Sequence, residues 1–196
     1  MKLIYRYKTR NMVEFSDGSR ASYSKKRYGP LLEKICKLAE DLNRKIWNYF
    51  EENEKEIIIF YWEQKTQQVL QTKIDVDKKH LIFSNYWTTN ANGYFFSRTN
   101  NEKIYLHSAV IGYFGKDKVV DHIDRNPKNN LLSNLRVVSF SQNGLNKGTR
   151  NTYWDKKCNK WRGRVVFEGK EYTEWFLTEE EAFLFTQKLK QKFLQQ

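Results

Sequence analysis

The sequence predicts an α+β protein made of three consecutive segments. Several short runs alternate apolar with polar residues or carry β-branched and aromatic residues, which is typical of strands bounded by turns. Two longer stretches repeat apolar residues at steps of three and four, which predicts one helix in the first segment and one in the last. Hydrophobic residues make up 39% of the chain and aromatic residues 16%, a content that supports folded cores and argues against disorder.

The first segment, residues 1–84, is expected to be an α+β region of unknown role. Its strand-like runs are LIYRYKT, MVEFS, EIIIFYW and QQVLQTKI, and SDGSRASYS supplies a glycine-containing turn. Pro30 is expected to open a helix, because a proline at the first helical position loses no hydrogen bond. The apolar stripe of this helix would be Leu31, Ile35, Leu38, Leu42, Ile46 and Phe50. For SKKRYG we expect a solvated turn, with a phosphate-contacting patch as the alternative.

The second segment, residues 85–147, is expected to carry a strand–strand–helix order. GYFFSR and KIYLHSAVIGYF flank the polar turn TNNE, which predicts a hairpin. The strand DKVVDHI, the loop DRNPKNNLLS and the strand NLRVVS follow. A short helix in FSQNGLNK would begin at Ser139 or Ser141, and Gly144 weakens it.

The third segment, residues 148–196, predicts a three-stranded sheet packed on one helix. The strands lie in TYWDKK, KWRGRVVFEG and KEYTEWF, with a Glu-Gly turn between the last two. Thr178 and Glu181 have the spacing of a capping box at the start of the helix. Its buried stripe would be Ala182, Phe185, Leu189 and Phe193.

Charge and composition narrow the class of partner. The chain has 35 lysines and arginines against 23 aspartates and glutamates, a formal net charge of +12, which favours a polyanion such as nucleic acid. The apolar run IIIFYW is far too short to cross a membrane and the N-terminus has no signal-peptide core, so we expect no membrane partner and no secretion. Cys36 and Cys158 lack CxxC partners, so we expect no structural zinc and a cytoplasmic protein with reduced thiols.

Chemistry-bearing side chains gather in the second segment. Asp121 and His122 stand at the end of a predicted strand, where a neutral imidazole could activate water and a carboxylate could bind a hard divalent cation. Asn134 opens the return strand and Asn143 lies in the predicted helix. One amide could accept from the imidazole N–H and another could offer its oxygen to a metal. A structural surface pair with incidental asparagines is the alternative.

The frame VVDHIDRNPKNNLLSNLRVVSFSQN resembles the HNH, or ββα-metal, nucleases, in particular the homing endonucleases of phages and introns. The resemblance implies that Asp121 binds the metal, His122 is the general base, Asn134 orients that base and Asn143 is the second metal ligand. It also implies one Mg²⁺ or Mn²⁺ ion per active site, with 5′-phosphate and 3′-hydroxyl products.

The stretch YLHSAVIGYF is similar to the His-Arg segment that commonly precedes this motif. Ser108 stands where the family usually has arginine. We therefore expect His107 to be a structural or DNA-contacting residue and not a catalyst.

The stretch NKWRGRVVFEGKEYTEWFLTEEEAFLF is similar to the plant ethylene-response-factor DNA-binding domain, whose three-stranded sheet lies in the major groove. Trp161, Val165 and Phe167 alternate with basic side chains, so one sheet face is apolar and the other basic. The expected DNA contacts are Lys160, Arg162, Arg164, Tyr172 and, from the second segment, Arg136. A solvated face that touches nothing is the alternative.

Taken together, the sequence predicts a divalent-metal-dependent, homing-type endonuclease that hydrolyses phosphodiester bonds in double-stranded DNA. One HNH motif gives one active site, so a monomer would nick one strand, and a double-strand break would need a dimer or two sequential events. We expect a monomer or weak dimer. A non-catalytic DNA- or RNA-binding regulator on the same scaffold is the main alternative. A nuclease for RNA or branched DNA is a second one, and residues 1–84 either extend the DNA footprint or bind a partner.

Overall fold

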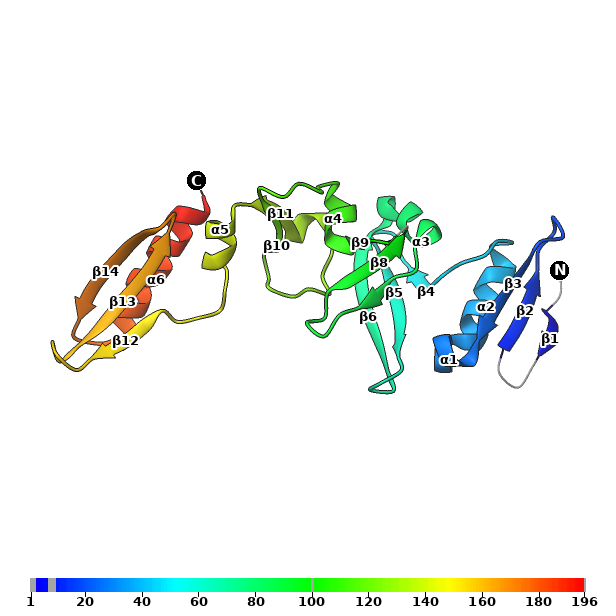
Figure 1. Cartoon of the computed structure of the whole chain (residues 1–196), viewed down its shortest axis with the longest axis horizontal. Helices are drawn as coiled ribbons and strands as arrows, with labels where there is room; N and C mark the ends of the chain where they lie inside the picture. The colour runs from blue at the N-terminus through cyan, green and yellow to red at the C-terminus, as the bar shows by residue number, and fades with distance from the viewer. Residues whose placement is uncertain (1–2, 7–9, 100, 196) are drawn as a thin grey trace. The chain divides into compact units, whose positions relative to one another are not determined.

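The computed structural model describes residues 3–6, 10–99 and 101–195 (Figure 1). Short helices alternate with small antiparallel sheets, which confirms the α+β class. The chain divides into two compact units, one of residues 1–114 and 126–135, the other of residues 115–125 and 136–196. The predicted segment 85–147 contributes to both units, and the three-segment division stays a prediction. No helix among the described residues is long and apolar enough to span a membrane.

The first unit begins with a three-stranded antiparallel sheet and one helix. The strands are β1 (Leu3–Arg6), β2 (Arg10–Glu14) and β3 (Arg20–Ser24), and helix α2 (Leu32–Asp41) packs on β2 and β3. The expected LIYRYKT strand is present as β1, and its residues 7–9 lie outside the described part of the chain. Val13, Tyr23, Ile35 and Ala39 belong to the buried core between sheet and helix.

The prediction of one helix running to Phe50 is wrong. Pro30 lies in a single 3₁₀ turn, and α2 ends at Asp41, two residues before Asn43, which takes a left-handed φ of 49°. Ile46 still reaches the same core from outside the helix, and Phe50 lies in strand β4 (Tyr49–Glu52). Apolar spacing therefore identified core residues correctly but could not reveal the left-handed residue that stops the helix.

Two other local predictions are also corrected. Residues 25–28 of SKKRYG form a short helix, α1 (Lys25–Tyr28), whose backbone is capped by the Ser24 hydroxyl. The expected strand KIYLHSAVIGYF remains a strand only to Tyr105 and then turns into helix α4 (Leu106–Ile111). Gly112, with φ of 73°, ends that helix.

The first unit also contains two further three-stranded sheets. Strands β4, β5 (Glu56–Glu63) and β6 (Gln68–Asp75) form one antiparallel sheet. Strands β7 (Thr88–Thr89), β8 (Phe95–Thr99) and β9 (Glu102–Tyr105) form the other, which confirms the expected β8–β9 hairpin. A 3₁₀ turn at Val76–Lys78 and helix α3 (His80–Ser84) connect the two sheets.

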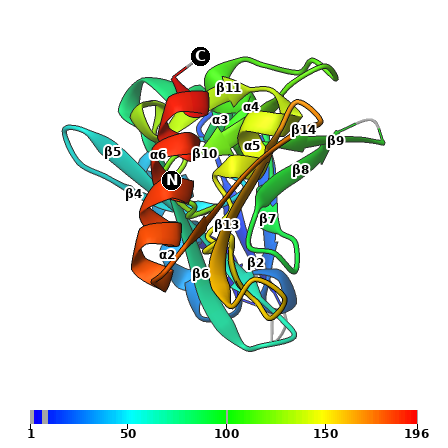
Figure 2. The ribbon, with the colours of Figure 1, turned by 90° about the vertical axis from the view of Figure 1, so that its left-hand side faces the viewer.

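The second unit ends in the predicted sheet-and-helix layer. Strands β12 (Thr152–Asp155), β13 (Lys160–Phe167) and β14 (Lys170–Phe176) form the sheet, and helix α6 (Glu179–Leu194) covers one face of it (Figures 1 and 2). The capping box of Thr178 and Glu181 is confirmed. Gly163 allows the close approach, because a Cβ there would lie 2.9 Å from the Ala182 carbonyl oxygen.

Candidate active site

The predicted strand–strand–helix motif is present. Strands β10 (Val119–His122) and β11 (Leu135–Val138) form a two-stranded sheet, a 3₁₀ turn (Leu132–Asn134) precedes β11, and helix α5 (Phe140–Leu145) follows it. Valine pairs favour both strands, since β-branched side chains suit a pleated surface. Ser139 begins α5 through a capping box with Gln142, as one of the two expected caps.

Asp121 is held rigidly in the second unit. Its side chain is only 7% exposed, and Oδ2 accepts hydrogen bonds from Arg136 Nε at 2.9 Å and Nη2 at 2.8 Å. The Asn146 amide donates to Oδ1 of the same carboxylate at 2.9 Å. Both carboxylate oxygens are therefore oriented by neighbouring side chains, and Oδ1 retains a lone pair.

His122 follows Asp121 at the end of β10, and it is buried. Its backbone carbonyl accepts from the Asn146 amide at 2.8 Å and from the Arg125 backbone N–H at 2.9 Å. The Asn146 carbonyl oxygen accepts in turn from Arg125 Nε at 3.4 Å. One buried asparagine thus fixes the Asp121 carboxylate and the backbone of His122 together.

Asn134 lies in the first unit, where a loop of residues 126–132 positions it. Its amide donates to the Asn129 carbonyl oxygen at 2.8 Å, and its side chain is buried. The hydrogen-bonded N–H side of the amide is therefore fixed, which also fixes the direction of its carbonyl oxygen.

Strand β6 holds the loop that carries Asn129. The backbone of Lys73 donates to the Lys128 carbonyl at 3.1 Å and accepts from the Asn130 N–H at 2.9 Å, one bond on each side of Asn129. The buried Thr72 hydroxyl donates to the Lys128 carbonyl at 2.8 Å and accepts from the Asn130 amide at 2.8 Å. A strand of the predicted N-terminal segment is therefore built into the support of Asn134.

Asn143 lies on α5 and is half-buried. Within the described residues, its side-chain amide makes no hydrogen bond, while its backbone bonds to Ser139 and Asn146. No group of three or more histidine, cysteine, aspartate or glutamate side chains is gathered in the described part of the chain. Oxygen ligands from Asp121 and Asn143 suit a hard divalent cation that keeps several waters, so these residues fit Mg²⁺ or Mn²⁺.

The ββα motif coincides with the model of a known protein family. That family is described as HNH endonuclease, and the match covers residues 108–145, from within α4 to the end of α5. Protein 3.8 of Escherichia phage T7 is 33% identical over 85 residues, and the alignment covers 39% of this chain and 70% of that protein. This chain belongs to the HNH endonuclease family. No solved structure matches the chain significantly.

Two residues of the ββα motif make more of its internal hydrogen bonds than the sequence indicated. Asn146 was missed, although it lies three positions after Asn143 and so shares one helical side with it. Arg136 was expected to contact DNA, but its guanidinium is engaged with Asp121. The same arginine therefore has a defined role inside the motif.

Three other residues that the sequence predicts to contact DNA lie on strand β13, on the basic face of the last sheet. Lys160 is exposed at the start of β13. Glu171 accepts from both arginines of that strand, from Arg162 Nη2 at 2.5 Å and from Arg164 Nη2 at 2.9 Å. The face is thus partly neutralised by a carboxylate on β14. The family match ends at residue 145, so the resemblance to the ethylene-response-factor domain stays a prediction.

Tyr172 does not lie on that basic face. It pairs with the buried Val165 in the sheet register and packs on Phe193 of α6, with ring centroids 4.8 Å apart. Side chains opposite each other in a sheet share a face, so Tyr172 faces the helix. Tyr172 therefore has a packing role in the structure, and its role as a DNA contact stays a prediction.

His107 belongs to α4 in the first unit. Its ring stacks on Tyr105 with centroids 5.2 Å apart and meets Tyr94 edge-on at 5.7 Å. His107 is therefore part of an aromatic cluster, and its exclusion as the catalyst stays a prediction.

Proposed function

We propose that the chain is a divalent-metal-dependent DNA endonuclease of homing type that hydrolyses phosphodiester bonds. The observation that carries the proposal is the buried, doubly held Asp121 carboxylate within the segment that matches the HNH family. Catalysis of this reaction needs groups that are already fixed before the substrate arrives. The hydrogen bonds around Asp121 and the His122 backbone supply that rigidity.

In this mechanism His122 takes the proton from the attacking water, and Asn134 orients the imidazole. The Asp121 carboxylate and the Asn143 amide oxygen would hold the cation, with water completing its ligands. The bound ion supplies positive charge for the phosphate and the leaving 3′-oxygen. The products are then a 5′-phosphate and a 3′-hydroxyl.

Double-stranded DNA is the proposed substrate, bound by a monomer or weak dimer in the cytoplasm of a phage-infected cell. Lys160, Arg162 and Arg164 would meet the duplex from the outer face of the third segment. The net charge of +12 supports a polyanionic partner.

The ion pair between Arg136 and Asp121 favours a second candidate function. Because the Asp121 carboxylate is already paired with a guanidinium, its negative charge attracts a metal cation less strongly. Weak metal binding would not impair a non-catalytic DNA-binding regulator, which needs no metal. Such a protein would bind DNA and never cut it.

Nicking of supercoiled plasmid tests the proposal. The purified chain is incubated with plasmid and Mg²⁺, Mn²⁺ or EDTA, and the open-circular product is measured on a gel. We expect metal-dependent nicks that DNA ligase reseals, because resealing requires a 5′-phosphate beside a 3′-hydroxyl. Nicks that ligase cannot reseal would contradict the product assignment, and tight binding without any nicking would favour the regulator.

A further inference from the structure

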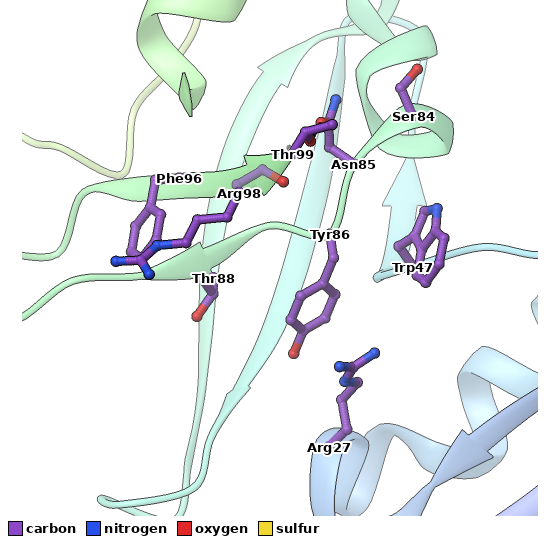
Figure 3. Close-up of a pocket in the computed structure, with 10 residues that line it drawn as sticks. Arg27, Trp47, Ser84, Asn85, Tyr86, Thr88, Phe96, Arg98 and Thr99 are labelled. Atoms are coloured by element: carbon purple, nitrogen blue, oxygen red, sulfur yellow. Dashed lines mark hydrogen bonds between the residues drawn. The ribbon is translucent and has the colours of Figure 1, made fainter. Parts of the chain in front are cut away.

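A cavity of about 540 Å³ opens on the first compact unit, and none of the predicted site residues lines it. Three aromatic side chains, Trp47, Tyr86 and Phe96, line it together with Arg27 and Arg98 (Figure 3). Figure 3 shows the Arg27 guanidinium directed at the Tyr86 ring, and the two groups are 4.8 Å apart. The lining therefore combines flat apolar surfaces with cationic side chains.

The charged side chains that line this cavity are all positive. Its lining contains no aspartate or glutamate, and in the described part of the chain neither Arg27 nor Arg98 forms an ion pair with a carboxylate. Both arginines are exposed. Two more cations stand at the rings, with Lys45 Nζ 4.0 Å from the Trp47 ring and Lys103 Nζ 4.3 Å from the Phe96 ring. The cavity is thus electrostatically suited to an anion.

Aromatic rings with adjacent guanidinium groups are well suited to binding single-stranded nucleic acid. Bases of a single strand stack on such rings while the phosphates meet the cations, and stacking tolerates any base sequence. A duplex keeps its bases paired and stacked inside, so rings that line a cavity reach only an unpaired base. We infer that this cavity binds an unpaired stretch of the DNA substrate, with a base on the rings and its phosphates at Arg27 and Arg98.

The inference rests on the proposed function, since it takes the polyanion to be the nuclease's own DNA. It assigns Arg27 and Trp47 of segment 1–84 to substrate recognition, together with residues 86–98, all outside the region that matches the HNH family. An enzyme that keeps an unpaired strand in this cavity recognises DNA in which a duplex adjoins a single-stranded stretch.

Fluorescence anisotropy in EDTA tests the inference without any cleavage. The probe is a fluorescein-labelled oligothymidine, compared with a labelled duplex of equal length. The double variant Arg27→Ala, Arg98→Ala is compared with the control Lys55→Ala, Lys65→Ala, which removes the same charge from exposed positions of the same unit. We expect the cavity variant to bind oligothymidine about tenfold more weakly than the control variant does. Equal affinities of the two variants, or no binding of oligothymidine by the wild type, would overturn the inference.

Photocrosslinking gives a second readout that needs no variant. The wild-type protein is irradiated with oligothymidine and the crosslinked peptides are identified by mass spectrometry. We expect crosslinks at Trp47, Tyr86 or Phe96, and crosslinks confined to other peptides would overturn the inference.

The two proposals fail separately. Oligothymidine binding that depends on Arg27 and Arg98, without nicking under any condition, would refute the nuclease and leave the cavity assignment intact. Nicking by a protein that ignores oligothymidine would refute the cavity assignment alone.

Discussion

Asn146 links the groups that the proposed mechanism needs more closely than any other single side chain described above. Its amide reaches the Asp121 carboxylate and the His122 carbonyl, and its oxygen accepts from Arg125. Because the Asn146 side chain is buried, each hydrogen bond that it lost would leave a polar group without a partner. These bonds therefore favour a single arrangement of Asp121, His122 and Arg125. The types and spacing of residues in the sequence predicted Asp121, His122, Asn134 and Asn143 as site residues. They did not predict Asn146, because the sequence does not reveal which asparagine side chain is buried or which groups it faces.

Asn146→Ala is expected to lower the free energy of unfolding by about 2 kcal/mol, since Asp121 and the His122 carbonyl lose a buried donor. Urea denaturation followed by tryptophan fluorescence measures the change. Asn92→Ala, at an exposed loop position, is the matched control and should change stability little. An unchanged midpoint for Asn146→Ala would remove the structural role given to this side chain.

The Arg136→Ala variant tests whether Arg136 stabilises the fold through Asp121 or contacts DNA. Because its guanidinium is engaged with Asp121, we expect a loss of about 2 kcal/mol in stability and no change in the salt dependence of DNA binding. A phosphate contact would instead reduce the slope of log K against log salt by about one. Anisotropy titrations at four salt concentrations decide between these results.

At the scale of elements, strand β6 and the loop 126–132 form a single support. The residue pattern of QQVLQTKI predicted strand β6 correctly, and the asparagines and proline of residues 126–132 predicted a loop. Their contact could not be predicted, because Thr72 and Asn130 are far apart in the chain and nothing in local periodicity pairs them. Helix ends were missed for a related reason, since the left-handed residue Asn43 and the strand-to-helix change after Tyr105 interrupt patterns that looked continuous.

Thr72→Val keeps the shape of the side chain and removes the hydroxyl that ties Lys128 to Asn130. If this contact positions Asn134, the nicking rate at saturating DNA should fall about tenfold, while DNA affinity stays unchanged. Thr72→Ser retains the hydroxyl and should restore the rate. A loss of affinity in step with the rate, or no rescue by serine, would contradict a positioning role.

Glu171→Gln tests the outer face of the β12–β13–β14 sheet. The change frees Arg162 and Arg164 from their shared carboxylate, so duplex affinity should rise about threefold at low salt. The Glu168→Gln variant removes the same charge from the exposed β13–β14 turn and serves as the control. Equal affinities for Glu171→Gln and the control would place this sheet face outside the DNA interface.

At the scale of the whole molecule, the net charge and the family match point to the same class of substrate. The charge of +12 favours a polyanionic partner, and the match to the HNH family supports the proposal that this partner is nucleic acid. The net charge and the HNH motif could be recognised in the sequence, because neither depends on how distant segments of the chain pack together. The role of residues 1–84 was not readable, because the β6 support and the aromatic cavity arise from side chains that only folding brings together.

The proposed mechanism depends on His122 acting as the base of a metal-dependent nuclease. The most direct test compares the nicking rates of the wild type, His122→Ala and His80→Ala, the last being an exposed histidine in the first unit. Supercoiled plasmid is used with Mg²⁺ and with EDTA, and plasmid binding is measured alongside. We expect Mg²⁺-dependent nicking by the wild type and His80→Ala, and a loss of at least about a hundredfold in His122→Ala with binding retained. Equal nicking by all three proteins would contradict it, because the catalytic centre would then lie elsewhere.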